Sequence, residues 1–217
     1  MDRNLSATYK MLRFLGFNYP EEEYGDVSLW RVVRQFFVNM RMKGLEKMMD
    51  WTILEPLNPR KIRPMILRKM GCTIGNDVFI GDYVSIDPGH GDLITIEDHA
   101  HLDAYCVLLC HKRDLSGYYI GGDYAKLPYK KGKIRLCKGC SVGTRSLVMP
   151  GVTIGEGAII GACSLVTKDI PAWTIAVGCP AKVVKRILKR DEMKQGELLF
   201  TGGGRITPLR NVIIKAA

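Results

Sequence analysis

The 217-residue chain contains few aromatic residues and lacks the long apolar runs of membrane-spanning helices. Phe, Trp and Tyr make up only 8% of it, and no uncharged apolar run approaches the roughly 18–20 residues that a spanning helix needs. The segment MDRNLSATYKMLRFLGF lacks an apolar stretch followed by a small-residue cleavage site, so it is not typical of a secretion signal. Seven cysteines without regular spacing favour reduced thiols. We therefore expect a cytoplasmic protein.

The rest of the composition is that of a globular protein with an excess of basic residues. Hydrophobic residues make up 47% of the chain and Gly contributes 23 residues, which excludes a disordered chain and a collagen-like repeat. Lys and Arg outnumber Asp and Glu by 32 to 22, so the surface attracts an anionic partner. Nucleic-acid binding would need exposed aromatic residues between the cations or a recognisable module. Neither is present, and we expect no nucleic-acid partner.

An aliphatic residue recurs every six positions over much of the chain. Twelve positions follow this frame: Ile74, Ile80, Ile86, Ile96, Leu102, Leu108, Leu136, Val142, Val148, Ile154, Ile160 and Val166. A small residue or Val stands four places after most of them, namely Val78, Val84, Ala100, Cys106, Cys140, Ser146, Val152, Ala158 and Ser164. Residues six positions apart do not lie on one face of a helix or coiled coil, whose periods are about 3.6 and 3.5 residues. A short strand followed by a bend can repeat at this interval.

The repeats predict a mainly β solenoid. Three hexads would form one triangular coil of about 18 residues, and the aliphatic and small residues would stack inward in ladders. The twelve hexads then give about four coils. Gly143, Gly155 and Gly161 follow an aliphatic position directly, so we expect them at bends that need unusual backbone angles or a close approach of chains.

The segments on either side of the repeats differ in character. Residues 1–60 are predicted to be helical, because apolar residues follow helical spacing over 29–40 with arginines between them. This region would form a cap on the open end of the solenoid, although a basic amphipathic helix can also lie on an anionic membrane. We expect the solenoid over residues 61–184. Residues 185–217 would then form a short basic helix and a tail.

The last repeats carry the string VMPGVTIGEGAIIGACSLVTKDIPAWTIAVGCPAKVV. This string resembles the hexapeptide-repeat acyltransferases, especially their sugar O-acetyltransferase branch, which includes maltose, galactoside and capsule-biosynthesis acetyltransferases. The resemblance covers residues 62–187 and implies a left-handed parallel β-helix, a homotrimer, and active sites between neighbouring subunits. It also implies acetyl-CoA as acyl donor. It says little about the acceptor.

The repeat frame is interrupted after Leu108 by a polar segment rich in Gly, Tyr and Lys. We expect residues 112–133 to leave the solenoid as a protruding loop, and loops on rigid scaffolds often carry function. The resembled family has its catalytic His at the start of this loop, which corresponds to His111. An imidazole titrates near pH 6.5, so a His can remove the hydroxyl proton as the acceptor oxygen attacks the thioester.

The resemblance also implies a cofactor groove. Six positions match places that line coenzyme A in the family: Thr144, Ala162, Thr167 and Lys168 along the pantetheine arm, and Lys182 and Lys185 near the adenosine phosphates. For Lys185, a solvated basic helix is an equal alternative. Asp87, Asp103 and Asp114 are candidates, by position only, for binding the acceptor. Cys179 stands where the family usually has Asn, and Ser141 where many sugar acetyltransferases have Trp.

The other histidines and the cysteines favour structural roles. His90 lies in an irregular bend, and His99 and His101 flank the inward Ala100, so all three are expected at the surface. Their spacing differs from that of the zinc-binding γ-class carbonic anhydrases, which are similar solenoids, and we expect no metal. The seven cysteines are interpreted as structural, with Cys106 and Cys140 in the core.

These observations predict an acetyl-CoA-dependent O-acetyltransferase acting on a sugar hydroxyl in polysaccharide or envelope biosynthesis. Within the enzymes, N-acetylation of an amino sugar or acetylation of an antibiotic is the alternative. From another class, the chain could be a non-catalytic β-helix subunit of a larger assembly, which would bind no coenzyme. Peripheral contact of the basic N-terminal helix with a membrane is a further alternative that no motif supports.

Overall fold

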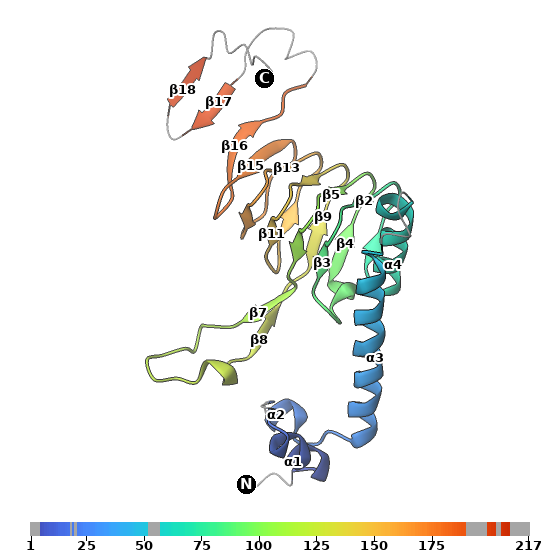
Figure 1. Cartoon of the computed structure of the whole chain (residues 1–217). Helices are drawn as coiled ribbons and strands as arrows, with labels where there is room; N and C mark the ends of the chain where they lie inside the picture. The colour runs from blue at the N-terminus through green and yellow to red at the C-terminus, as the bar shows by residue number, and fades with distance from the viewer. Residues whose placement is uncertain are drawn as a thin grey trace.

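A computed structural model describes residues 5–17, 19, 21–51, 57–189, 199–202 and 205–208. The helices are α1 (Ala7–Phe14), α2 (Glu21–Tyr24), α3 (Leu29–Met48) and α4 (Arg63–Lys69), with short turns η2 (Asn58–Ile62), η3 (Gly91–Leu93) and η4 (Tyr124–Lys126). The strands are β1 (Thr73–Ile74), β2 (Phe79–Ile80), β3 (Ser85–Ile86), β4 (Ile94–Ile96), β5 (His101–Leu102), β6 (Val107–Leu108), β7 (His111–Arg113), β8 (Tyr129–Lys131), β9 (Ile134–Leu136), β10 (Ser141–Val142), β11 (Leu147–Val148), β12 (Thr153–Ile154), β13 (Ile159–Ile160), β14 (Leu165–Val166), β15 (Thr174–Val177), β16 (Lys182–Arg186), β17 (Leu199–Gly202) and β18 (Arg205–Pro208). The described part of the chain is therefore mainly β (Figure 1).

Most of the strands belong to three parallel sheets. Sheet A contains β1, β4, β9 and β12, and sheet C contains β3, β6, β11 and β14. Sheet B contains β2, β5, β10, β13 and β15 and continues into β16, β17 and β18. Successive strands of the chain belong to sheets A, B and C in turn, and the next strand pairs with the previous one in sheet A. This is the arrangement expected of a β-helix (Figure 1).

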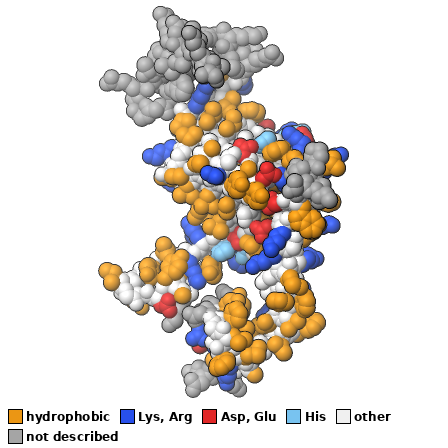
Figure 2. Space-filling model, viewed as in Figure 1, with side chains coloured by type: hydrophobic (Ala, Val, Ile, Leu, Met, Phe, Trp, Pro, Cys, Tyr) orange, Lys and Arg blue, Asp and Glu red, His pale blue; other side chains and the backbone are white. Residues whose placement is uncertain are grey.

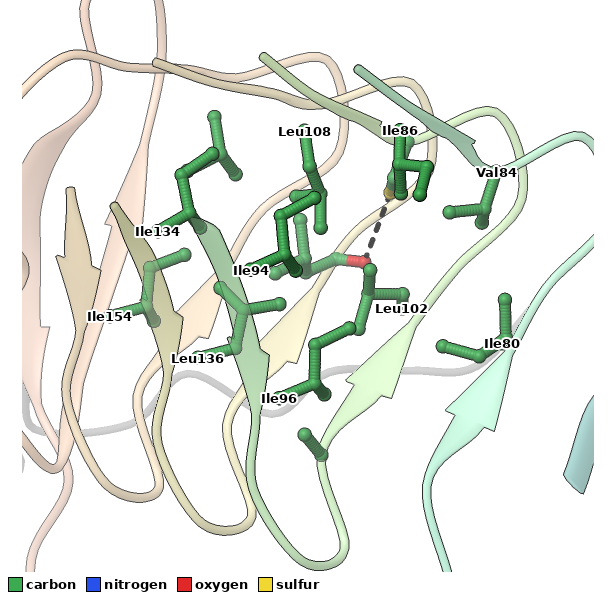
Figure 3. Packing of buried hydrophobic residues seen from close by; sticks show 14 of the residues in the cluster. Ile80, Val84, Ile86, Ile94, Ile96, Leu102, Leu108, Ile134, Leu136 and Ile154 are labelled. Carbon is green, nitrogen blue, oxygen red and sulfur yellow. Dashed lines mark hydrogen bonds between the residues drawn. The ribbon is translucent and has the colours of Figure 1, made fainter. Parts of the chain in front are cut away.

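The core lies between the three sheets. All twelve aliphatic positions of the six-residue frame are buried, and so are the nine small positions that follow them. Figure 3 shows side chains from different sheets, among them Ile94, Leu102 and Leu108, converging on the interior. The predicted inward ladders are confirmed, because a short strand that faces the interior at every coil must present an apolar residue there.

Neighbouring residues of β13 allow a direct test of this core. Ile160 is 1% exposed and points inward, whereas Ile159 is 40% exposed on the same strand. We expect Ile160→Ala to lower the free energy of unfolding by about 2–5 kcal/mol, because it removes buried carbons and leaves a cavity. Ile159→Ala, which removes the same atoms from the surface, should cost less than about 1 kcal/mol. Urea unfolding followed by circular dichroism measures both, and equal losses would contradict the inward ladder.

The bends between strands form three corners that stack from coil to coil. The AB corner (75–78, 97–100, 137–140, 155–158) joins sheets A and B, and the BC corner (81–84, 103–106, 143–146, 161–164) joins B and C. At the AB corner, a Cβ added to Gly155 would lie 2.4 Å from the backbone N of Ala172 on the next coil. Gly155 therefore serves close approach of chains rather than an unusual backbone angle. The left-handed backbone angle falls later in the turn, as at Gly157 (φ 61°).

The N-terminal helices cover the first coil only in part. Leu67 and Ile66 of α4 are buried in the core, and Leu45 and Met48 at the C-terminal end of α3 pack against it. No side chain of α3 itself is buried. Most of the apolar residues expected to form the cap are exposed instead, namely Leu29, Phe36, Phe37 and Met40. Figure 2 shows hydrophobic side chains gathered at the surface along this helix. None of the described helices is long and apolar enough to cross a membrane.

The predicted C-terminal helix is wrong at its start. Lys182–Arg186 form β16, which pairs antiparallel with β15, with Val183 opposite Ala176 and Lys182 opposite Val177. β15 is the last parallel strand of sheet B, so without β16 the backbone groups along its outer edge would be unpaired. Hydrogen bonding to this edge outweighs the helical pattern of the basic residues. Residues 187–189 form no helix either, and residues 190–198 lie outside the described residues.

Candidate active site

The third corner, which joins sheets C and A, carries two insertions into the repeat. Between β3 and β4 the interval of the frame stretches to ten positions, from Ile86 to Ile96, and between β6 and β9 it opens into the long loop. β3 and β6 are neighbours in sheet C, with Ile86 opposite Leu108. The two insertions therefore leave the solenoid side by side. This CA corner brings the bend 87–93 against the start of the loop.

Asp87 and His111 meet at this corner. Oδ2 of Asp87 contacts Nδ1 of His111 and also accepts a hydrogen bond from the backbone N–H of Cys110 at 3.1 Å. The Asp87 side chain is 3% exposed, whereas that of His111 is 30% exposed. A buried carboxylate thus holds one ring nitrogen of a partly exposed His.

Two further rings surround His111. The His90 ring lies 5.2 Å from it, and the Tyr129 ring lies 4.9 Å from it in an edge-on arrangement. His90 comes from the bend after β3, and Tyr129 comes from β8 at the far end of the loop. Nδ1 of His90 is 3.6 Å from Oδ1 of Asp87, which is longer than a hydrogen bond.

The loop begins and ends as an antiparallel hairpin of β7 and β8, which projects from the solenoid (Figure 1). In its register, His111 lies opposite Lys131 and Arg113 lies opposite Tyr129. The Arg113 guanidinium lies 4.0 Å from the centre of the Tyr129 ring and 5.7 Å from that of Tyr124. This stacking fixes the Tyr129 ring beside His111, so the base of the hairpin is part of the site.

The Asp87–His111 pair has the geometry of an oriented general base. With Nδ1–H donating to the Asp87 carboxylate, the lone pair of the neutral imidazole lies on Nε2, on the opposite side of the ring. The carboxylate also stabilises the positive charge that the imidazole acquires on taking a proton. The pair can therefore deprotonate a hydroxyl or an ammonium group presented to Nε2 of His111.

The other two acidic candidates lie elsewhere. Asp103, at the BC corner, contacts Nε2 of His101 through its Oδ1 atom at 3.0 Å. Asp114 lies within the loop, where its side chain accepts a hydrogen bond from the Ser116 backbone N–H, and this bond holds the pKa of Asp114 below its usual range. Of the three positions, the structure places only Asp87 in contact with His111.

The residues predicted to hold coenzyme A occupy two different corners. Thr144 and Ala162 lie in successive turns of the BC corner, where the N–H of Cys163 donates to the Thr144 carbonyl. Thr167 and Lys168 follow β14 at the CA corner and are exposed. Lys182 begins β16, just after Ala181, whose N–H donates to the Leu165 carbonyl. These sets therefore flank the two ends of the strands of sheet C.

Lys168 and His111 share the CA corner, two coils apart. The N–H of Leu109 donates to the Val148 carbonyl, and that of Met149 donates to the Val166 carbonyl, which defines the stack. At about 4.8 Å per coil, the start of the loop is roughly 10 Å from Thr167 along the solenoid axis. An extended arm running parallel to that axis would join the two places.

The remaining histidines and the core cysteines agree with the sequence analysis. His99 and His101 point away from the core and contact Asp77 and Asp103, respectively. Cys106 and Cys140 are fully buried, and burial raises the pKa of Cys106 to about 11 and that of Cys140 to about 12. Both thiols are therefore protonated and unreactive at neutral pH.

Sequence reasoning missed His90 and Tyr129 as neighbours of His111. The six-residue frame could have indicated His90. The frame is interrupted after β3 and again after β6, which are neighbouring strands of sheet C, so the two inserted segments must lie next to each other. Tyr129 gave no such signal, because its place depends on how β8 pairs with β7 across the loop. The interpretation of His90 as a surface residue is only partly right, since its side chain is 23% exposed.

The repeat segment matches a known family. Residues 133–168 match the family described as bacterial transferase hexapeptide (six repeats). The chain is 29% identical to the dTDP-4-amino-4,6-dideoxy-D-glucose acyltransferase of Escherichia coli over 145 residues, which cover 55% of this chain and 76% of that protein. The repeat segment is therefore similar to the hexapeptide transferases, and a larger part of the chain is similar to one sugar acyltransferase.

Two further comparisons extend this result. A candidate acetyltransferase of Staphylococcus aureus (strain COL) is 53% identical over 58 residues, which cover 27% of this chain, so the chain spans only 29% of that relative's length. The solved structure of a maltose O-acetyltransferase from Clostridium difficile 630 matches 71% of this chain and 88% of its own, with a TM-score of 0.55 and 22% identity. The structural match supports the fold.

Proposed function

We propose that the protein is an acetyl-CoA-dependent O-acetyltransferase that modifies a sugar hydroxyl in polysaccharide or envelope biosynthesis in the cytoplasm. The observation that carries the proposal is the contact between buried Asp87 and half-buried His111 at the base of the β7–β8 hairpin. Homology to a sugar acyltransferase over 55% of the chain supports the reaction class. The non-catalytic alternative leaves this oriented His at the surface without a purpose.

In the proposed reaction, His111 removes the proton of the acceptor hydroxyl through Nε2. The acceptor oxygen attacks the thioester carbonyl, and the tetrahedral intermediate collapses with release of coenzyme A. The proton on His111 passes to the leaving thiolate, which balances the step. Asp87 keeps the ring oriented throughout and stabilises its transient positive charge. Tyr129 and the hairpin form the wall against which the acceptor is held.

The two-corner distribution of the cofactor residues favours a groove between subunits. On a single chain, sheet C separates Thr144 and Ala162 from Thr167 and Lys168. One extended pantetheine arm therefore cannot contact both pairs of residues on the same chain. In the homotrimer of left-handed β-helices that we propose, the BC corner of one subunit would face the CA corner of its neighbour. Each groove would then take Thr167, Lys168 and His111 from one chain and Thr144 and Ala162 from the next.

Calorimetric titration with acetyl-CoA tests the cofactor site. We expect binding in the micromolar range and a roughly tenfold weakening in Lys168→Ala, equivalent to about 1.4 kcal/mol, because a cation near the bound cofactor is lost. Lys138→Ala at the AB corner is the matched control, since it removes an exposed Lys from a different corner, and its affinity should be unchanged. If the folded wild-type protein bound no acetyl-CoA, the scaffold alternative would take precedence.

Transfer to the amine of a nucleotide-linked amino sugar is a second candidate. The Escherichia coli relative acts, by its name, on such a sugar, and the match covers 76% of its length. The hairpin beside His111 also exposes Lys112, Lys130 and Lys131, which would attract a diphosphate. A panel of maltose and dTDP-4-amino-4,6-dideoxyglucose as acceptors, with release of coenzyme A as the readout, separates the two candidates.

A further inference from the structure

Asp87, His90 and His111 form a cluster of metal-ligand atoms. Each offers one ligand atom, and these atoms all lie within 4.8 Å of one another. Histidine side chains reach the surface beside the base of the hairpin (Figure 2). The cluster differs from an ordinary surface group of acids, because it contains two imidazoles, and its carboxylate is almost fully buried.

His90 supplies an independent indication of a ligand. Its Nδ1 atom is buried and, within the described part of the chain, has no hydrogen-bond partner. A buried polar atom without a partner costs free energy, which a bound group would recover. This atom lies 3.6 Å from Oδ1 of Asp87. Two ligands of a tetrahedral zinc ion, each about 2.0–2.1 Å from the metal, are separated by a similar distance of roughly 3.4 Å.

We propose that Asp87, His90 and His111 bind a zinc ion that reversibly inhibits the protein. Imidazole nitrogen and carboxylate oxygen are both zinc ligands, and three protein ligands with a fourth position open to solvent form a common zinc site. The partial exposure of His90 and His111 gives the ion a route in from solvent. The expectation of no metal rested on the spacing of the histidines and on the lack of a second cysteine pair beside Cys137 and Cys140, and it did not consider a carboxylate as a ligand.

The inhibitory consequence rests on the proposed function. A zinc ion bound through Nδ1 of His111 would replace the contact with Asp87 that orients the ring. A zinc ion bound through Nε2 would occupy the nitrogen that takes the acceptor proton. In either case His111 stops acting as a base while the metal is bound, and removal of the metal restores it. Free zinc would therefore regulate the activity.

Zinc binding is tested directly, without any acceptor. Full-length protein freed of metal with a chelator is titrated with zinc chloride in competition with a chromophoric chelator. We expect one equivalent of zinc per chain in the wild type and at least about tenfold weaker binding in His90→Gln. His101→Gln, a change of the same kind on β5, is the control and should bind as the wild type does. Equal zinc binding by all three proteins would overturn the site.

Activity provides the second readout and separates the two proposals. We expect zinc to inhibit acetyl transfer by the wild type and to inhibit His90→Gln less, when each protein is compared with itself in the presence of a chelator. Circular dichroism checks that His90→Gln is folded. Stoichiometric zinc binding without inhibition would overturn the regulatory role. If no acceptor is acetylated under any condition, the proposed function fails, and the titration still decides whether the metal site exists.

Discussion

Replacing His111 by Asn is expected to lower the turnover of acetyl transfer by about 10²- to 10⁴-fold, the range that a positioned general base contributes. Asn keeps a polar side chain of similar size at the base of the hairpin but offers no basic nitrogen. The affinity for acetyl-CoA should change little, because the cofactor candidates Thr167 and Lys168 lie two coils away. Release of coenzyme A in the presence of the acceptor panel measures turnover, and calorimetry measures the affinity.

His101→Asn is the matched control for this change. It removes a His of similar exposure from β5, where the side chain stacks on Phe79 and contacts Asp103. Its turnover should remain within a factor of about two of the wild type, since it lies on sheet B, away from the CA corner. Turnover of His111→Asn equal to that of the control would remove His111 from the mechanism. A parallel loss of acetyl-CoA binding in His111→Asn would instead show that His111 holds the cofactor, so the lower turnover would no longer identify it as the base.

The mainly β fold and its inward-facing positions could be predicted from the sequence because the signal is repeated every six residues. Each inward position, from Ile74 to Val166, is constrained by the same geometry, so an error at one position does not disturb the frame. The C-terminal segment offered no such repetition. Its basic residues around Lys185 predicted a helix, but this segment pairs as a strand with β15. Such pairing is a tertiary interaction that local residue spacing does not encode.

The candidate site was predictable only in part for a related reason. His111 stands at the start of the insertion that breaks the frame, and its place followed from the resemblance. The contact with Asp87 depends on the lateral neighbours in sheet C, where Ile86 lies opposite Leu108, and so on the register of two coils rather than on any single motif. For the same reason, position alone ranked Asp87 equally with Asp103 and Asp114.

Asp87→Asn is expected to lower turnover by about tenfold to 10⁴-fold while leaving the KM for acetyl-CoA nearly unchanged, because it removes the group that orients the base. The carboxylate now accepts from both the Cys110 N–H and Nδ1 of His111. An amide has one acceptor oxygen, and its NH₂ group can only donate. If the oxygen stays with Cys110, the NH₂ group faces Nδ1 and favours the tautomer that carries its proton on Nε2, which cannot accept a proton there.

The ¹⁵N chemical shifts of the His111 ring distinguish this effect from a general loss of structure. We expect the wild type to show a protonated Nδ1 and Asp87→Asn to show a protonated Nε2 in a folded protein. Asp103→Asn serves as the control, because that carboxylate contacts His101 and should leave the His111 tautomer and the turnover unaltered. If Asp87→Asn kept the wild-type tautomer and turnover, the buried carboxylate would be a structural partner of Cys110 alone, and His111 would have to work as a base without it.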